Sequence, residues 1–161
     1  MARRAVILTI STSKAAGDGH DESGPRLAAL AQQLVAEVAS VEVIADEQAL
    51  IEARLRHWCD VERCELILTS GGTGLAPSDV TPEATRAVIE REAPGIPQAM
   101  REASRAHTEN WMLSRALAGT RGRTLIVNFP GSPAAIEQTG EAIAAPLRHA
   151  LALLSGGDAG H

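Results

Sequence analysis

A glycine-rich loop followed by an acidic residue is the part of this sequence best suited to chemistry. Gly71-Gly72-Thr73-Gly74 follows the apolar run Leu66–Leu68, and three glycines within four residues allow positive φ angles and leave backbone amides unshielded. Asp79 comes next, and Thr81-Pro82 then supplies the capping residue and first-turn proline of a helix. The order is therefore a strand, a loop with unshielded amides, a carboxylate and the start of a helix. This arrangement is suited to holding an anionic ligand.

A second loop of the same kind follows the apolar run Thr124–Phe129. This loop is Pro130-Gly131-Ser132-Pro133, in which Ser132 before Pro133 repeats the pairing of a capping residue with a first-turn proline. The carboxyl ends of parallel strands lie at one edge of a sheet, where open α/β sheets bind their ligands. We therefore expect both loops to open on the same side of the sheet.

Two carboxylates each come just after a predicted strand. Asp46 follows Val41–Ile44 and precedes a helical segment, so it is either the N-cap of that helix or a functional carboxylate. Asp79 is either a functional carboxylate or part of a local turn. Carboxylates of this kind can hold Mg²⁺, which bridges phosphates and offsets charge during transfer. The residues thus indicate phosphoryl or nucleotidyl transfer on a small anionic substrate.

Several common catalytic fingerprints are missing from the sequence. There is no Gly-x-x-x-x-Gly-Lys-Ser/Thr and no Gly-x-Gly-x-x-Gly, which excludes a P-loop NTPase and the usual dinucleotide-binding motif. There is also no Gly-x-Ser-x-Gly elbow and no His-Glu-x-x-His. What remains is the pair of glycine-rich loops with the two carboxylates.

The elements that must position these residues alternate along the chain. Ala5–Ile10 and Thr124–Phe129 are continuous apolar runs, typical of strands buried on both faces. Apolar residues from Leu27 to Val38 recur at helical spacing, whereas Gly119–Arg123 is predicted to be a turn. The alternation predicts a three-layer α/β/α fold with a mostly parallel sheet and right-handed crossovers. Ser11 and Thr12 start a polar loop at a strand end, which is compatible with ligand contact and equally with a solvated loop.

Length and composition narrow the possible domain organisation, partners and location of the protein. The 161 residues predict a single domain over residues 1–154, followed by a tail, 155–161, that nothing in the sequence orders. The net charge of −5 and the scarcity of aromatic residues argue against nucleic-acid and anionic-membrane partners. No apolar run approaches membrane-spanning length, and Cys59 and Cys64 are predicted to be reduced thiols. We therefore expect a soluble cytoplasmic protein.

Four segments of the sequence, taken in order, resemble the MogA/MoaB family of molybdenum cofactor biosynthesis, whose domain also occurs in gephyrin-type proteins. These segments are Thr69-Ser-Gly-Gly-Thr-Gly74, Asp79-Val-Thr-Pro-Glu-Ala84, Leu113-Ser-Arg115 and Asn128-Phe-Pro-Gly-Ser-Pro133. The resemblance covers residues 5 to 154, and it implies a molybdopterin-binding α/β fold, usually assembled as a trimer. It also implies molybdopterin adenylyltransferase activity, in which molybdopterin reacts with ATP and Mg²⁺ to give adenylyl-molybdopterin and pyrophosphate.

The resemblance also implies roles for individual residues. Asp46 and Asp79 would be catalytic and would hold Mg²⁺ with ATP. The molybdopterin-binding residues would be Ser70, Gly71, Gly72, Thr73, Gly74, Ser114, Gly131, Ser132 and Pro133. Ser11 and Thr12 would contact the nucleotide, and a molybdenum-insertion protein would act downstream.

Two other functions are compatible with the same sequence. One is a non-catalytic pterin-binding or scaffolding protein of the MoaB type, which needs the glycine loops but not both carboxylates. The other is a nucleotide pyrophosphatase related to CinA-type domains, in which water would replace molybdopterin as the nucleophile at the same metal site.

Overall fold

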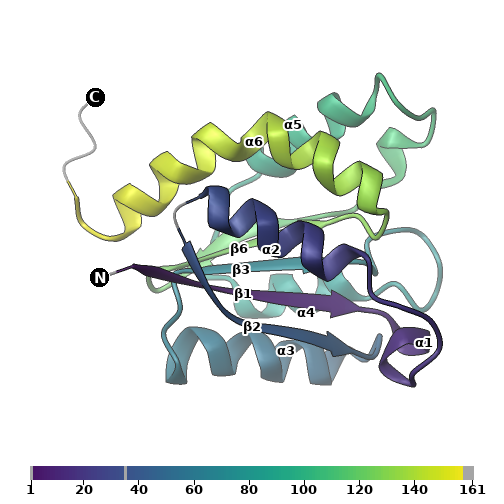
Figure 1. The fold of residues 1–161 in the computed structure, drawn as a ribbon, viewed down its shortest axis with the longest axis horizontal. Coiled ribbons are helices and arrows are strands. Elements are labelled where there is room, and N and C mark those ends of the chain that lie inside the picture. The colour runs from purple at the N-terminus through teal and green to yellow at the C-terminus, as the bar shows by residue number, and fades with distance from the viewer. Residues whose placement is uncertain (1, 35, 158–161) are drawn as a thin grey trace.

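The structure is a computed structural model that describes residues 2–34 and 36–157. Figure 1 shows how its helices and strands are arranged. Their bounds, in chain order, are β1 Arg3–Ile10, α1 Thr12–Ala15, α2 Ser23–Gln33, β2 Ala36–Ile44, α3 Gln48–Arg56, the π-helix η1 His57–Val61, β3 Leu66–Ser70, α4 Thr81–Val88, β4 Arg91–Glu92, α5 Gly95–Ser104, the 3-10 helix η2 Trp111–Leu113, β5 Ala118–Arg121, β6 Thr124–Phe129 and α6 Pro133–Leu154.

The six strands form one sheet in the order β2-β1-β3-β6-β5-β4. The pairs β1–β2, β1–β3 and β3–β6 are parallel, while β5 pairs antiparallel with both β6 and β4. Parallel neighbours need crossover connections, which here are made by helices. The predicted mostly parallel sheet is therefore confirmed, with an antiparallel edge that the sequence did not reveal.

Helices cover both faces of this sheet, which confirms the predicted three layers. In Figure 1, α5 and α6 lie above the sheet and α3 lies below it; α2 packs on the same face as α6, and α4 packs beside α3 on the other face. One core cluster joins Leu27, Met100, Ile136 and Leu147 to the upper face of the sheet. The other joins residues of α3 and α4, including Ile51, Leu55, Ala84 and Val88, to the lower face. Aliphatic side chains dominate both cores, with the fully buried Phe129, the single phenylalanine of the chain, in the first and Trp58 packed against the second.

The helix predicted to continue to Val38 is shorter than expected. It ends at Gln33, and Val38 instead lies in β2, where it pairs with Ala5 of β1. The register jumps from Ala5↔Val38 to Val6↔Ser40, so Ala39 is an extra residue in β2. Such a bulge interrupts the alternation that marks a strand. The bulge lies after the predicted stripe, and the stripe was extended too far because Val38 comes four residues after Leu34, which matches helical spacing although Val38 lies in a strand.

The predicted turn over residues 119–123 is also shorter than expected. Gly119 lies within β5, and only Gly122 and Arg123 form the turn into β6. A Cβ at Gly119 would lie 2.6 Å from the Arg91 carbonyl oxygen of the neighbouring strand, so the glycine allows a close approach between strands. A glycine used for packing was therefore mistaken for one used for turning.

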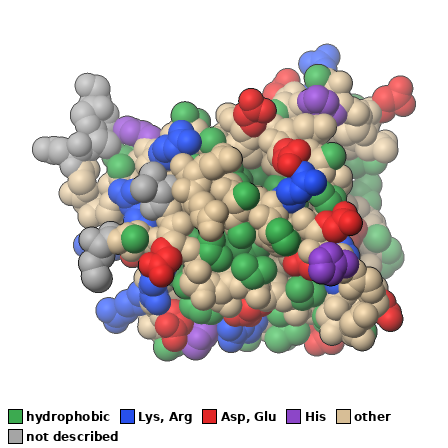
Figure 2. Space-filling view, viewed as in Figure 1, with side chains coloured by type: hydrophobic (Ala, Val, Ile, Leu, Met, Phe, Trp, Pro, Cys, Tyr) green, Lys and Arg blue, Asp and Glu red, His purple; other side chains and the backbone are tan. Residues whose placement is uncertain are grey.

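The remaining features concern the surface and the C-terminus. On the face drawn in Figure 2, acidic and basic side chains are interspersed over the surface. No helix among residues 2–34 and 36–157 is long and apolar enough to span a membrane. Of the tail predicted over 155–161, residues 155–157 form the turn that ends α6, where Gly156 N donates to Leu153 O at 3.1 Å. Residues 158–161 lie outside the described part of the chain.

Candidate active site

The Gly71–Gly74 loop leaves the C-terminal end of β3 in a conformation that excludes larger residues. Gly71 and Gly72 have φ angles of 92° and 67°. A Cβ at Gly71 would lie 2.4 Å from Ile10 O, and a Cβ at Gly72 would lie 2.3 Å from Thr81 Oγ1. The loop is fixed by Thr81, which donates from N to Gly72 O at 3.1 Å and from Oγ1 to Gly71 O at 2.9 Å. Glycine is thus required here by conformation and by space.

Most backbone amides of this loop have no hydrogen-bond acceptor in the described part of the chain. Gly71 N donates to Phe129 O at 3.1 Å, but the N–H groups of Gly72, Thr73 and Gly74 donate to no acceptor within the described residues. The buried Ser70 Oγ, at the end of β3, also lacks a hydrogen-bond partner there. Unsatisfied buried polar groups are rare, and a ligand or ordered water is their usual partner. The loop therefore has the donors of an anion-binding site.

Asp46 lies against one side of this loop. Thr12 donates from N and from Oγ1 to Asp46 Oδ2, each at 2.9 Å, and Asp46 N donates back to Thr12 Oγ1 at 3.0 Å. The other oxygen, Oδ1, lies 3.2 Å from where a Cβ of Gly72 would be. The N-cap position of α3 is occupied by Glu47, so the alternative in which Asp46 caps that helix is wrong.

Asp79 lies against the other side. Its Oδ2 accepts from Ala76 N at 3.1 Å, and its backbone N donates to Ala76 O at 2.9 Å, so local turn chemistry is present as one alternative predicted. The same Oδ2 lies 2.8 Å from where a Cβ of Gly74 would be. In the described part of the chain, Oδ1 of Asp79 and Oδ1 of Asp46 have no hydrogen-bond partner. Each carboxylate is thus anchored by one oxygen while the other stays available.

The second predicted loop packs directly on the first. A Cβ at Gly131 would lie 3.6 Å from Gly71 Cα, and the Gly131 carbonyl accepts from Ser23 Oγ at 2.7 Å. Ser132 is the N-cap of α6, accepting from Ala135 N at 3.5 Å, and Pro133 is the first residue of that helix. Both loops therefore open at the same edge of the sheet, as predicted.

A small pocket lies beside these loops. Its volume is about 110 Å³, and Ser114 and Pro130 are among its lining residues. The rest of its lining comes from α5, η2 and α6 and the segments next to them: Met100, Arg101, Ser104, Thr108, Asn110, Trp111, Ala116, Ala135 and Thr139. Of the residues predicted to bind molybdopterin, only Ser114 lines this pocket. Gly131, Ser132 and Pro133 lie next to it along the chain.

Of the two residues predicted to contact a nucleotide, the structure links one to a carboxylate. Thr12 bonds to Asp46, as described above. Ser11 caps the short helix α1, accepting from Lys14 N at 3.3 Å, and its own N–H donates to Ile44 O at 2.9 Å. Ser11 thus joins the ends of β1 and β2, which brings Thr12 next to Asp46.

Two residues that organise the site were not assigned a role from the sequence. Arg115 bonds to the glycine loop, to the Asp79 carbonyl and to Glu83. Asn128 is fully buried, where its Nδ2 donates to Thr69 Oγ1 and Thr85 Oγ1 at 3.0 Å and its Oδ1 accepts from Leu117 N at 3.1 Å. Both lie within segments that carried the family resemblance, which is the signal that could have identified them.

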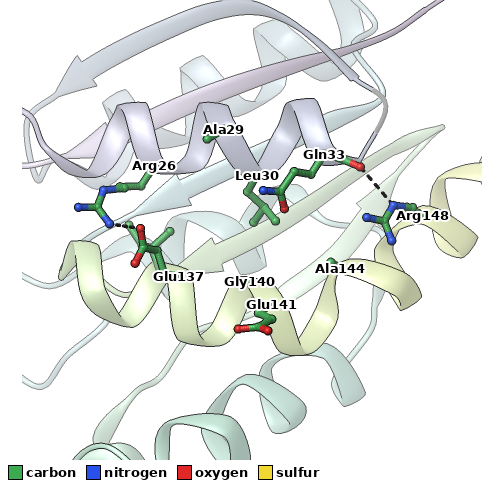
Figure 3. Close-up of a pocket in the computed structure, with 10 residues that line it drawn as sticks. Arg26, Ala29, Leu30, Gln33, Glu137, Gly140, Glu141, Ala144 and Arg148 are labelled. Atoms are coloured by element: carbon green, nitrogen blue, oxygen red, sulfur yellow. Dashed lines mark hydrogen bonds and ion pairs between the residues drawn. The ribbon is translucent and has the colours of Figure 1, made fainter.

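Several larger pockets lie elsewhere in the described part of the chain, and the two of about 570 Å³ contain none of the predicted site residues. One, of about 570 Å³, lies between α2 and α6. Figure 3 shows an ion pair between Arg26 and Glu137 at one end of it and Arg148 bonded to the Gln33 carbonyl at the other. The second is lined in part by the free thiols Cys59 and Cys64, before the N-terminal end of β3. Size alone therefore does not identify the site.

Comparison with known proteins finds relatives that match most of this chain. Residues 6–149 match the sequence model of the family described as "Probable molybdopterin binding domain". The chain is 41% identical over 149 residues to the molybdenum cofactor synthesis protein cinnamon of Drosophila melanogaster, covering 92% of this chain and 25% of that protein. It is 40% identical over 139 residues to the molybdopterin adenylyltransferase of Haemophilus influenzae, covering 85% of this chain and 71% of that protein.

A solved structure extends the agreement to the fold. The molybdopterin biosynthesis enzyme MoaB from Thermus thermophilus superposes with a TM-score of 0.89 at 44% sequence identity, and the match covers 97% of this chain and 98% of that one. The likeness in fold therefore extends over nearly the whole chain.

Proposed function

Because this chain belongs to the family of probable molybdopterin binding domains, we propose that it transfers the adenylyl group of ATP to molybdopterin in molybdenum cofactor biosynthesis. The single observation that carries the proposal is the position of the two carboxylates. Asp46 lies against Gly72 and Asp79 against Gly74, on either side of three amides without a partner in the described chain. A site that only bound a pterin would need the amides but not both carboxylates.

The proposed reaction joins two phosphates. An oxygen of the terminal phosphate of molybdopterin attacks the α-phosphorus of ATP and forms a new P–O bond. The bond from the α-phosphorus to the bridging β-phosphate oxygen breaks, and its electron pair leaves with pyrophosphate. The attacking phosphate is already ionised at neutral pH, so the site needs donors and positioning more than a base. The product is a mixed anhydride, which a later step can cleave.

The chain's residues divide between the two substrates in this proposal. Ser70 and the Gly71–Gly74 amides would hold the phosphate on the pterin side, and Ser114 with Gly131–Pro133 would line the molybdopterin site. Thr12, together with Ser11, would lie on the nucleotide side, where it orients Asp46. Amides that are fixed before the substrate arrives need no reorganisation as charge develops.

The donor set also fits a magnesium ion shared with the substrate. Magnesium commonly binds through one or two carboxylates together with substrate phosphates and water. The part of the chain that the structure describes has no group of three or more His, Cys, Asp or Glu residues placed for a metal, so a cage made by protein alone does not fit. Asp46 and Asp79 would hold the ion through their Oδ1 atoms. When bound, magnesium neutralises charge on the phosphate oxygens.

The decisive experiment is an adenylyl-transfer assay with the purified protein, molybdopterin, ATP and Mg²⁺. We expect adenylyl-molybdopterin and pyrophosphate in equal amounts, separated and quantified by chromatography. Molybdopterin binding without either product would indicate a scaffold, and pyrophosphate released without molybdopterin would indicate a nucleotide pyrophosphatase. Either result would overturn the proposal.

The wider setting is proposed on the same family grounds. We expect a homotrimer in the cytoplasm whose product is used by a molybdenum-insertion protein. Light scattering coupled to size-exclusion chromatography tests the trimer directly, and a monomer in solution would contradict it.

A further inference from the structure

Arg115 ties the carboxylate-bearing segment after the glycine loop to the body of the protein. We propose that Arg115 is a positioning residue, which holds segment 74–79 so that Asp79 faces the substrate; this inference rests on the proposed adenylyl transfer. Arg115 would act through Asp79 and would not touch the reacting atoms.

The contacts of Arg115 close the segment at both ends. Its Nε donates to Gly74 O at 2.8 Å, and its Nη2 donates to Asp79 O at 2.8 Å. Its Nη1 donates to Glu83 Oε1 and Oε2, at 2.5 and 3.1 Å, in the first turn of α4. The backbone N–H of Arg115 also donates to Thr73 O at 2.8 Å. One residue therefore joins the glycine loop, the carboxylate segment and the following helix.

Little else holds segment 74–79. Leu75 is 65% exposed, and residues 76–78 are exposed as well. The other hydrogen bonds of this segment are internal, between Ala76 and Asp79. Within the described chain, both hydrogen bonds from the segment to other parts of the protein are donated by the Arg115 guanidinium. The internal turn holds the Asp79 carboxylate within the segment, and the Arg115 guanidinium holds the segment against the rest of the described chain.

The geometry requires a guanidinium. Three different nitrogens of Arg115 reach three different residues, which a planar fork of donors can do and a lysine ammonium, as a single point, cannot. An ion pair as exposed as this one, with side chains 35% and 42% accessible, contributes little to global stability because water screens it. The loss of the fork should therefore affect turnover much more than folding.

The test compares two arginines with the same chemistry in different places. Arg121 lies at the end of β5, outside the site, where it donates from Nε and Nη2 to Asp60 at 2.9 Å each and from Nη1 to Val88 O at 3.0 Å. We expect Arg115→Lys to lower kcat for adenylyl transfer by about a hundredfold, the effect of displacing a catalytic group by about 1 Å. The dissociation constant for molybdopterin should stay unchanged, and Arg121→Lys should leave kcat unchanged.

A second measurement reports on the segment without any turnover. Thermolysin cuts before large apolar residues, so the rate of cleavage at Leu75 reports how firmly the segment is held. We expect this rate to rise in Arg115→Lys and to stay at the wild-type value in Arg121→Lys, while both variants keep similar melting temperatures.

The outcomes separate this inference from the function on which it rests. Wild-type protein that makes no adenylyl-molybdopterin would overturn both. If the wild type is active and Arg115→Lys matches it in kcat or in cleavage at Leu75, only the positioning role is overturned. A fall in melting temperature that is much larger in Arg115→Lys than in Arg121→Lys would also overturn it, because the side chain would then be structural.

Discussion

Thr12 and Asp46 exchange three hydrogen bonds across the ends of β1 and β2, and these bonds fix the Asp46 carboxylate beside Gly72. Thr12 Oγ1 both donates to Asp46 Oδ2 and accepts from Asp46 N. The hydroxyl therefore orients the side chain and the backbone of the same residue. Its position leaves Oδ1 of Asp46 as the oxygen available to a ligand.

Replacement of Thr12 by valine tests this orientation. Thr12→Val keeps the shape and the backbone donor but removes both bonds of the hydroxyl. A hydrogen bond to a charged group contributes about 1.5–3 kcal/mol, so we expect kcat/KM for ATP to fall by about tenfold to a hundredfold. Steady-state kinetics at saturating molybdopterin measure this. The control is Ser13→Ala, since among the described residues the Ser13 hydroxyl bonds only to Ser11 Oγ, at 3.3 Å. Wild-type kinetics in Thr12→Val would contradict the role of Thr12.

Asp79→Asn removes the negative charge and nearly preserves the shape of the side chain. We expect adenylyl transfer to fall by at least about a hundredfold, as when a single preorganised group is removed from an active site, with the melting temperature within a few degrees of wild type. Full turnover in Asp79→Asn or Asp79→Ala would overturn the role of this carboxylate.

Asp46→Ala serves as the companion variant. It should lose adenylyl transfer but keep tight molybdopterin binding, because we place Asp46 on the ATP side.

Much of this site could be predicted from the sequence because its signals are local. Gly71–Gly74 and Ser132-Pro133 determine their own backbone conformation, and the parallel sheet then brings them to one edge. Asp46 was harder, since the choice between capping and function depends on Thr12, which is 34 residues away. Arg115 was harder still, because its partners come from three other segments and no spacing rule connects them.

The errors in the fold have a similar origin. The spacing of Val38 from Leu34, which matches a helix, disguised the first half of β2, and the close approach of Gly119 to Arg91 disguised β5. In both places the strand is defined by its pairing with a neighbouring strand, which single-sequence periodicity does not contain. The strands of the sheet's interior were predicted well, because continuous apolar runs such as Thr124–Phe129 need no partner to be recognised.

Gly72→Ala should damage the site through both space and backbone conformation. Its φ of 67° disfavours any side chain, and the new Cβ would lie 2.3 Å from Thr81 Oγ1, which anchors the loop. We expect a loss of about 1–3 kcal/mol in the free energy of unfolding and a loss of most activity. Gly122→Ala is the matched control, since Gly122 has a φ of 56° but no atom of the described residues within 4 Å of its Cβ position. Gly122→Ala should lose a similar free energy of unfolding from backbone strain but keep full activity. An equal loss of activity in both variants would contradict this account.

Asn128→Leu should be among the most destabilising single changes beneath the site. It would leave the buried Thr69 and Thr85 hydroxyls and the Leu117 amide without their partner. Each unsatisfied buried group costs about 1–3 kcal/mol, so we expect a loss of at least about 3 kcal/mol in urea unfolding. The control is Thr139→Val, because in the part of the chain that the structure describes the buried Thr139 hydroxyl bonds only to carbonyls of its own helix. An equal loss in the free energy of unfolding in both variants would show that the Asn128 network contributes no more than the single Thr139 hydroxyl.

The buried thiols should make the protein less stable in alkali. Burial raises the pKa of Cys59 to about 11 and that of Cys64 to about 12, from an ordinary value of 9.0. As the pH rises above about 9, the unfolded chain releases these protons first, so the stability is complete below that pH and is lost toward pH 11–12. Each thiol adds a slope of up to about 1.4 kcal/mol per pH unit. Urea unfolding across this range measures the slope, and the absence of tyrosine together with a single lysine, Lys14, keeps competing titrations few. The double variant Cys59→Ala/Cys64→Ala should be less stable at neutral pH, because the smaller side chains leave cavities. Its free energy of unfolding should fall less steeply with pH above about 9 than that of the wild type. An equally steep fall would show that other groups are responsible.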